Sequence, residues 1–194
     1  MDAIDAIQRR RSVNRLTAPA PSDDDLRTIL EAAACAPDHG ELRPFRFAVL
    51  RGAGMAAFGR VLEDAYRARC LDAGVEPVTA KAVKERTKLA RAPLVVIVSC
   101  VPAGAVTIPR VEQLAACAAA CQNALVAATA LGYGSMWRTG EACYDQRVKA
   151  ALGLQPEDAL VGFLYLGTVA ERTRPAATTP NVGNLDGLVQ EWNG

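Results

Sequence analysis

The feature that most constrains this chain is a run of about 21 apolar and small residues, from Val111 to Leu131. A helix of that length measures roughly 32 Å at 1.5 Å per residue, which raises the question of a membrane span. Glu112, Gln113, Gln122 and Asn123 interrupt the run, and neither flank carries a topogenic signal. We therefore expect no membrane association and a central helix that is covered on all sides.

A helix built from Ala, Cys, Thr and Leu lets neighbouring backbones approach closely, and a chain of this size covers such a helix most easily by dimerising. The sequence after it turns at Gly132 and Gly134 and then continues as a predicted short strand. Trp137, Arg138 and Thr139 follow, presenting an aromatic ring, a cation and a hydroxyl in succession. This order is typical of a binding site.

Length and charge limit the possible functions. The 194 residues suit one domain, residues 1–194, that is large enough to bury a full core. With 22 basic and 21 acidic residues the formal charge is +1, so no overall field attracts nucleic acid or a membrane surface. Any cationic function must therefore be local.

The six cysteines form no CxxC pair and no metal-type cluster, and the N-terminus has no secretory hydrophobic segment. A reducing cytoplasm is the expected compartment. Cys117 and Cys121 share a helix face, where they could react or bind a metal, but small buried hydrophobes are the favoured interpretation. His39 is the only histidine, which excludes a multi-histidine metal site, and we expect no metal.

A basic segment follows a short predicted helix capped by Asp2. Between Arg9 and Arg15 it concentrates four arginines and Ser12. One interpretation is a solvated helix end, where cations suit the helix dipole. The other is a phosphate site, because guanidinium forks and a hydroxyl are the donors that a phosphate needs. The segment alone leaves both interpretations open.

A polar loop from Cys35 to Phe45 separates a predicted helix, N-capped by Ser22, from a predicted strand over residues 45–50. Loops placed in this way often carry function. His39 lies in this loop beside an aspartate. With no nucleophile tied to it, a catalytic triad is weakly supported, and the residue alone favours a solvent-facing histidine.

Two further apolar runs, Leu94–Ser99 and Leu160–Gly167, are predicted as buried strands of a core sheet. Gly52–Ala57 matches GxGxxA with Asp72 about 20 residues onward, as a dinucleotide fold would require. We interpret it as a false match, because residues 55–73 form one predicted helix, and the acid should instead end a second strand. The charged stretch Lys81–Lys88 is predicted as a helix on the surface.

The C-terminal part from Arg172 is rich in Thr, Pro, Asn and Gly. Its isolated apolar residues are suited to wrapping around a partner subunit. These residues are Val182, Leu185, Leu188, Val189 and Trp192.

Four motifs taken in order resemble the nitroreductase family, in particular its short YdjA-like branch of FMN-dependent enzymes. They are Arg10-Arg11-Ser12, the Ala36–His39 loop leading to Pro44-Phe45, Trp137–Gly140, and Gly162–Thr168. The resemblance implies an α+β fold with a mainly antiparallel central sheet flanked by helices. It also implies a homodimer with the long core helix at the interface and FMN sites shared between subunits.

The resemblance further implies which residues bind FMN. Arg10, Arg11 and Ser12 would hold the phosphate and ribityl chain, and Trp137, Arg138 and Thr139 would line the ring or phosphate side. Pro37, Asp38 and His39 would reach the flavin from the other subunit, and Arg172 would be a phosphate ligand.

The chain departs from the family pattern at three places. Cys35 stands where an arginine is expected, Arg43 and Phe45 replace the usual Gln-Pro-Trp, and Asn14 stands where a second cation is common. Another residue must therefore supply the cation at the flavin N1 and O2 edge. Arg11, Arg15 and Arg138 are candidates, of which we favour Arg15, and His39 would help only when protonated.

The implied activity is transfer of hydride from NADH or NADPH through FMN to a nitroaromatic, a quinone or a similar small-molecule acceptor, in a ping-pong cycle. FMN carries this chemistry, so the protein needs cations, donors and an open face, but no nucleophile. Two alternatives remain. One is another flavin reaction on the same scaffold, such as dehydrogenation or flavin fragmentation. The other is a non-catalytic nucleotide- or nucleic-acid-binding module that uses Arg9–Arg15.

Overall fold

The computed structural model describes residues 1–104, 106–170 and 185–192, so the predictions for Arg172 and Val182 lie outside the described residues. The α-helices are α1 (Ala3–Arg9), α2 (Asp23–Ala34), α3 (Gly52–Asp72), α4 (Thr79–Thr87), α5 (Arg110–Ala130) and α6 (Gln146–Ala151). Short 3-10 helices are η1 (His39–Glu41), η2 (Lys88–Arg91) and η3 (Glu141–Cys143). The strands are β1 (Leu16–Thr17), β2 (Phe45–Arg51), β3 (Leu94–Cys100), β4 (Gly134–Arg138) and β5 (Ala159–Val169).

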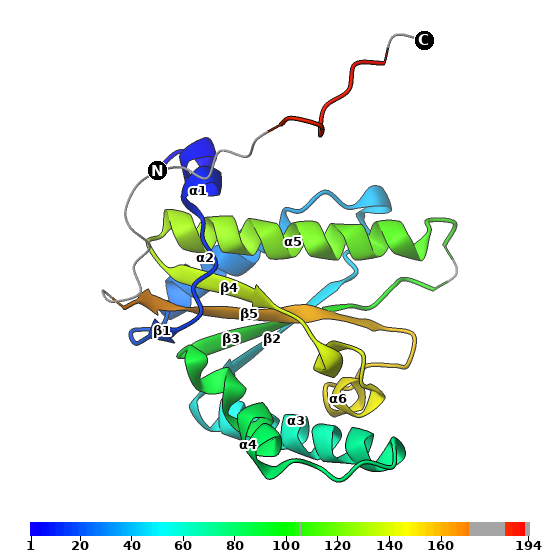
Figure 1. Ribbon diagram of the computed structural model, residues 1–194. Coiled ribbons are helices and arrows are strands. Elements are labelled where there is room, and N and C mark those ends of the chain that lie inside the picture. Colours follow the sequence, from blue (N-terminus) through cyan, green and yellow to red (C-terminus); the bar gives the residue numbers. More distant parts are fainter. Residues whose placement is uncertain (105, 171–184, 193–194) are drawn as a thin grey trace.

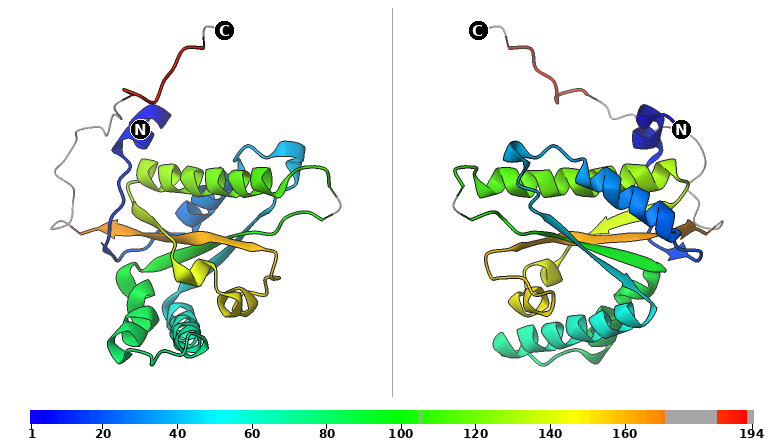
Figure 2. Two further views of the ribbon diagram at one scale, coloured as in Figure 1. Left: turned by 45° about the vertical axis from the view of Figure 1, so that its right-hand side comes forward. Right: turned by 180° about the vertical axis from the view of Figure 1, so that it is seen from behind.

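A single antiparallel sheet lies at the centre of the fold, as predicted (Figure 1). The strand order is β1-β5-β3-β2, and β4 also pairs with β5. One isolated parallel bridge joins Ser12 to Ser135. Helices α5 and α2 cover one face of the sheet, while α3, α4 and α6 cover the other, and α1 lies on the outer side of α5 (Figures 1 and 2).

Three helices begin at N-cap residues of the types that favour this position. The carboxylate of Asp2 accepts a hydrogen bond from the Asp5 amide, and the Ser22 hydroxyl accepts one from the Asp25 amide. Asp145 accepts from the Arg147 amide at the start of α6. Each cap satisfies an amide that has no partner within its own helix, so these boundaries follow from local chemistry.

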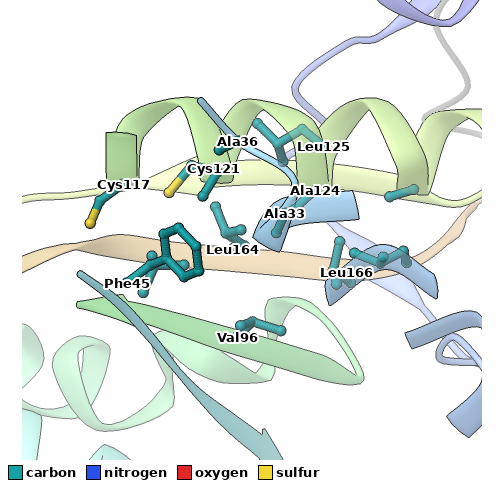
Figure 3. Packing of buried hydrophobic residues seen from close by; sticks show 14 of the residues in the cluster. Ala33, Ala36, Phe45, Val96, Cys117, Cys121, Ala124, Leu125, Leu164 and Leu166 are labelled. Carbon is teal, nitrogen blue, oxygen red and sulfur yellow. The ribbon is translucent and has the colours of Figure 1, made fainter. Parts of the chain in front are cut away.

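The face of the sheet under α5 is packed with small and aliphatic side chains (Figure 3). Cys117, Cys121 and Ala124 of α5 point toward Leu164 and Leu166 of β5. Because the small α5 residues have short side chains, the helix lies close to the sheet. The two thiols are fully buried, which confirms that they act as small hydrophobes.

The opposite face uses the alternate residues of the same strands. Phe163 and Tyr165 of β5 pack with Val95 and Ile97 of β3 beneath α3 and η2. Strand β3 is buried along its whole length, as its continuous β-branched run predicts. The sheet therefore has two covered faces, and β5 contributes side chains to both.

The GxGxxA match is not a nucleotide motif in this fold. Gly52 begins α3, and Asp72 ends the same helix. The strand before them, β2, pairs antiparallel with β3, whereas a dinucleotide fold needs a parallel βαβ unit. The sequence interpretation of a false match is confirmed.

Helix α5 is not covered on all sides within one chain. Val111 is 70% exposed and Leu114 is 40% exposed on its outer face. It is the one helix in the described ranges that is long and apolar enough to be considered as a membrane span, with 44% of the relevant window buried. Core helices of globular proteins share these properties, and α5 packs on the sheet in that manner.

Candidate functional site

The basic N-terminal segment runs beside the start of β4. The Arg10 amide closes α1 by donating to the carbonyl of Ala6 at 3.0 Å. After it, Ser12 forms the bridge with Ser135, and the Val13 amide donates to the Ser135 carbonyl at 3.0 Å. These contacts fix the backbone of the arginine-serine motif against the strand that leads to Trp137.

Two arginines of this segment already have hydrogen-bond or ion-pair partners on or next to α1. The Arg11 guanidinium donates to the carbonyls of Gln8 at 2.6 Å and Arg10 at 2.9 Å. Arg9 forms an ion pair with Asp5 one helical turn earlier. Arg9 and Arg15 are nevertheless exposed, so these contacts do not decide against the binding-module alternative.

Arg138 connects the two site segments that the sequence predicts separately. Its Nη2 donates to Oδ1 of Asn14 at 3.1 Å, and its guanidinium carbon lies 5.7 Å from the ring centre of Tyr165. Its Nε is buried and has no hydrogen-bond partner among the described residues. An unmade bond from a buried donor costs free energy, so this N–H group is suited to a ligand.

Trp137 is held by a close approach of β5. Its Nε1 donates to the carbonyl of Val161 at 3.2 Å. A Cβ on Gly162 would lie 2.3 Å from that Nε1, and Gly162 has φ +155°. Only glycine fits there without displacing the indole. The Trp137 side chain packs against the core under α5, so its predicted contact with a flavin stays a prediction.

A pocket of about 350 Å³ opens next to Arg138, and we call it the cationic pocket. Tyr165 and Phe163 belong to its lining, and η3 and the α4–η2 segment supply further wall residues. Five of its lining residues are cations, against two acids. The cations are Lys81, Lys84, Lys88, Arg91 and Arg138, the acids are Glu85 and Glu141, and Thr139, Gly140 and Ala142 complete the lining with the two aromatic residues.

Burial keeps the phenol of Tyr165 neutral at ordinary pH. Burial raises the pKa of Tyr165 to about 12, although Arg138 and Arg91 favour the phenolate. Lys88 forms an ion pair with Glu85 at 2.6 Å. The pocket therefore combines a neutral aromatic wall with an excess of positive charge.

The cations on α4 and η2 are the part of this pocket that the sequence analysis missed. Lys81 and Lys84 are exposed, as a surface helix predicts, but Lys88 and Arg91 are half-buried beside the sheet. The spacing of the three lysines at 0, 3 and 7 places them on one helix face. This spacing could be read from the sequence. It predicts that the three lysines share a helix face, but not which part of the protein that face lies against.

The predicted loop residues lie elsewhere. Cys35 is exposed and follows the last turn of α2, and Pro37 is exposed after it. Asp38 accepts from the Arg43 amide at 2.5 Å through one oxygen, while its Oδ1 is buried and has no partner among the described residues. Arg43 has φ +47°, an uncommon conformation for a residue with a side chain, so the loop holds a constrained shape.

His39 joins this loop to the start of α5. Its Nδ1 lies 2.7 Å from Oε2 of Glu112, and both side chains are exposed. Ser12, in contrast, pairs with Ser135 just beyond the other end of α5. The helix is roughly 30 Å long at 1.5 Å per residue, so one chain does not bring the two predicted halves of the site together.

Three of the four buried thiols have a raised pKa, while a hydrogen bond with Cys117 lowers the pKa of Cys100. Burial raises the pKa of Cys121 to about 12 and that of Cys143 to about 11. A hydrogen bond with Cys100, together with burial, raises the pKa of Cys117 as well. Within the described ranges, no group of three or more His, Cys, Asp or Glu residues could hold a metal ion.

Comparisons with known proteins agree with this fold. A family model described as the Nitroreductase family matches residues 7–168. The chain is 36% identical over 182 residues to YdjA of Escherichia coli K12, provisionally named an NAD(P)H nitroreductase, covering 93% of this chain and 96% of that protein.

Two solved structures are similar over the whole chain. The nitroreductase-like family protein of Bacillus cereus superposes with a TM-score of 0.77 at 24% identity, covering 100% of this chain and 97% of the other. A provisionally named nitroreductase of Desulfovibrio desulfuricans, solved in complex with FMN, gives 0.69 at 25% identity and covers 100% and 98%.

Proposed function

The chain belongs to the nitroreductase family, and on that premise we propose that it is an FMN-dependent oxidoreductase that oxidises NADH or NADPH and reduces a small-molecule acceptor such as a nitroaromatic or a quinone. The names of its relatives support this, since YdjA is named for NAD(P)H and the Desulfovibrio desulfuricans protein was solved with FMN. The single observation that carries the proposal is the meeting of the Asn14 segment, β4 and the cationic pocket at Arg138.

The residues present fit an anionic flavin cofactor. FMN carries a phosphate and has hydrogen-bond acceptors along one edge of its ring, so it needs cations and donors near an apolar wall. The cationic pocket supplies Lys88, Arg91 and Arg138 beside Phe163 and Tyr165. The buried Nε of Arg138 offers a donor that no described residue uses.

In this proposal Arg10, Arg11 and Ser12 hold the phosphate and ribityl chain, and Trp137, Arg138 and Thr139 lie along the ring. When bound, FMN supplies the hydride chemistry. The chain's own residues bind and orient the cofactor and place positive charge beside its ring. Arg138 rather than Arg15 stabilises negative charge at the ring edge. Arg138 is half-buried with a covered Nε, whereas Arg15 is exposed, and a cation acts more strongly where water is partly excluded.

The complete site is formed by two chains of a cytoplasmic homodimer, each a single domain of residues 1–194. The partner's loop contributes the residues equivalent to Pro37, Asp38 and His39. Two observations support this: the loop and Ser12 lie at opposite ends of α5, and Val111 and Leu114 expose apolar surface at the loop end of that helix. A second copy would cover that surface.

The phosphate assignment is tested by comparing FMN with riboflavin, which lacks the phosphate. We expect Arg10→Ala or Ser12→Ala to weaken FMN binding by about 1.5–3 kcal/mol, the range for a hydrogen bond to a charged group. Riboflavin binding should change less. Arg27→Ala, on the exposed side of α2, is the matched control. Equal losses for both ligands would show that Arg10 and Ser12 do not contact the phosphate.

The shared site is tested by subunit mixing. An Arg10→Ala chain and a His39→Ala chain each lack one half of the proposed site, so each homodimer should bind FMN weakly. A heterodimer of the two chains should contain one intact site and recover FMN binding and activity. Full activity in a monomer at high dilution would contradict the shared site.

A further inference from the structure

The cationic pocket carries more positive charge than its own two acids neutralise. Glu85 is already paired with Lys88 at 2.6 Å, and Glu141 lies 3.5 Å from Arg69, which is outside the pocket. Glu85 therefore neutralises only Lys88, and Glu141 is committed to a cation outside the pocket. Lys81 and Lys84 form no ion pair with a carboxylate among the described residues.

These two lysines lie at the exposed edge of the pocket on α4, whereas Lys88 and Arg91 are half-buried. Lys81 and Lys84 are three residues apart, so their side chains leave the helix on the same face one turn from each other. The ammonium of Lys81 lies 5.0 Å from the ring centre of Tyr66. The ring steadies this cation without neutralising it.

Resting on the proposed function, we infer that Lys81 and Lys84 form a clamp for a carboxylate or phosphate group on the electron acceptor, so that the enzyme favours anionic acceptors over neutral ones. Two ammonium groups one helical turn apart can both donate charge-assisted hydrogen bonds to one carboxylate or phosphate group. The lysines bind the acceptor and take no part in electron transfer. This assigns a substrate class to the site.

In the proposed function the flavin ring lies along Trp137, Arg138 and Thr139. It therefore takes up the Arg138 side of the pocket and leaves the exposed edge at Lys81 and Lys84 for the acceptor. The formal charge of the whole chain is only +1. Attraction of an anion must therefore come from the pocket itself and weaken as salt screens it.

The test uses the FMN-loaded enzyme and two acceptors of the same shape, 4-nitrobenzoate and its neutral analogue 4-nitrobenzamide. We expect wild-type kcat/KM to favour the anion by about tenfold at low ionic strength, with the preference shrinking as salt is added. The double substitution Lys81→Gln with Lys84→Gln should reduce that ratio toward one, through the KM of the anion. Arg86→Gln is the matched control, because Arg86 is on the same helix but faces Glu63 at 3.5 Å.

Three results would overturn the clamp. The first is an unchanged acceptor ratio in the double variant, and the second is a ratio that falls equally in Arg86→Gln. The third is a loss confined to flavin reduction by NADPH in single-turnover measurements, which would assign the lysines to the reductant. The salt dependence of the wild-type ratio is a readout that needs no variant. A wild-type protein that binds no FMN would contradict the proposed function itself. Failure of the lysine clamp can therefore be distinguished from failure of the proposed function.

Discussion

The two faces of the sheet are built for different tasks, although they share the same strands. On the α5 side, Leu164 and Leu166 of β5 meet closely packed small residues. On the other side, Phe163 and Tyr165 of the same strand belong to a core cluster and also line the cationic pocket. The alternation of a strand thus lets one element serve packing and ligand binding at once.

The difference also shows how each helix layer is matched to its task. Helix α5 is rich in alanine and buried cysteine, so it can approach the sheet and leave an apolar outer face for association. Helix α4 is short and cationic, and it lines the pocket with side chains that reach solvent. Substitutions on the α5 side should affect mainly stability, while those on the α4 side should affect mainly ligands.

The largest effect is expected from Leu164→Ala, which removes a fully buried side chain from the α5 face. The cost should be about 2–5 kcal/mol of unfolding free energy, since a cavity is left in a packed core. Urea denaturation measures it. Leu114→Ala, on the exposed outer face of α5, is the control and should cost much less at protein concentrations where the chain is monomeric. Equal losses would contradict the assignment of a closed core on this side.

Gly162→Ala should displace both Trp137, which packs in the core on the α5 side, and Arg138, which lines the cationic pocket. The added Cβ would lie 2.3 Å from Trp137 Nε1 and 2.8 Å from the Arg138 carbonyl. Backbone strain alone is expected to cost about 1–3 kcal/mol. Displacement of Arg138 should weaken FMN binding as well. Gly54→Ala, a helical position with open space around it, should be neutral or stabilise by up to about 1 kcal/mol. Urea unfolding and FMN titration of both variants provide the measurement. Equal stability and equal FMN affinity in the two variants would contradict the prediction.

Arg138→Gln sharpens the comparison on the ligand side. We expect the protein to keep its stability but to hold reduced FMN less well, which lowers the midpoint potential by about 30 mV per 1.4 kcal/mol for a two-electron couple. Arg15→Gln should change the potential less, because Arg15 is exposed. Potentials of flavin-loaded variants provide the measurement. A larger shift in Arg15→Gln would transfer the role to Arg15, and no shift in either would assign it to backbone donors.

The smallest effect is expected from Tyr133→Phe, which removes a bond between the turn after α5 and the start of α2. The Tyr133 hydroxyl donates to Asp25 at 2.7 Å, and this bond, together with that of Ser22, lowers the pKa of Asp25 below its ordinary value of 3.8. A lowered pKa stabilises the fold above the ordinary value, and the contribution is lost as pH falls through the folded value. The variant should therefore differ slightly from wild type near neutral pH and converge with it in acid. Carboxyl NMR titration of Asp25 checks the shift.

Local signals in the sequence predicted the framework well. The caps at Asp2, Ser22 and Asp145 and the β-branched run of β3 are properties of neighbouring residues, so one sequence suffices to find them. The false dinucleotide match could be rejected for the same reason, because residues 55–73 are helical by pattern.

The cationic pocket could not be predicted, because it depends on which elements meet in space. The lysines of α4 have a helical spacing, but only the packing of α4 and η2 against α3 brings them to one pocket with Arg138. The bond between Arg138 and Asn14 joins residues 124 positions apart. The unusual backbone of Arg43 likewise follows from the Asp38 bond across the loop, which no periodic pattern reveals.

The central claim is tested most directly by one anaerobic titration of the purified protein. FMN is added first and excess flavin is removed, and the visible spectrum is then followed as NADPH or NADH is added without oxygen. We predict that flavin stays with the wild-type protein and that its visible absorbance bleaches in proportion to the reductant added, with weak FMN retention in Arg10→Ala. A protein that retains no flavin, or retained flavin that neither nucleotide reduces, would contradict the account.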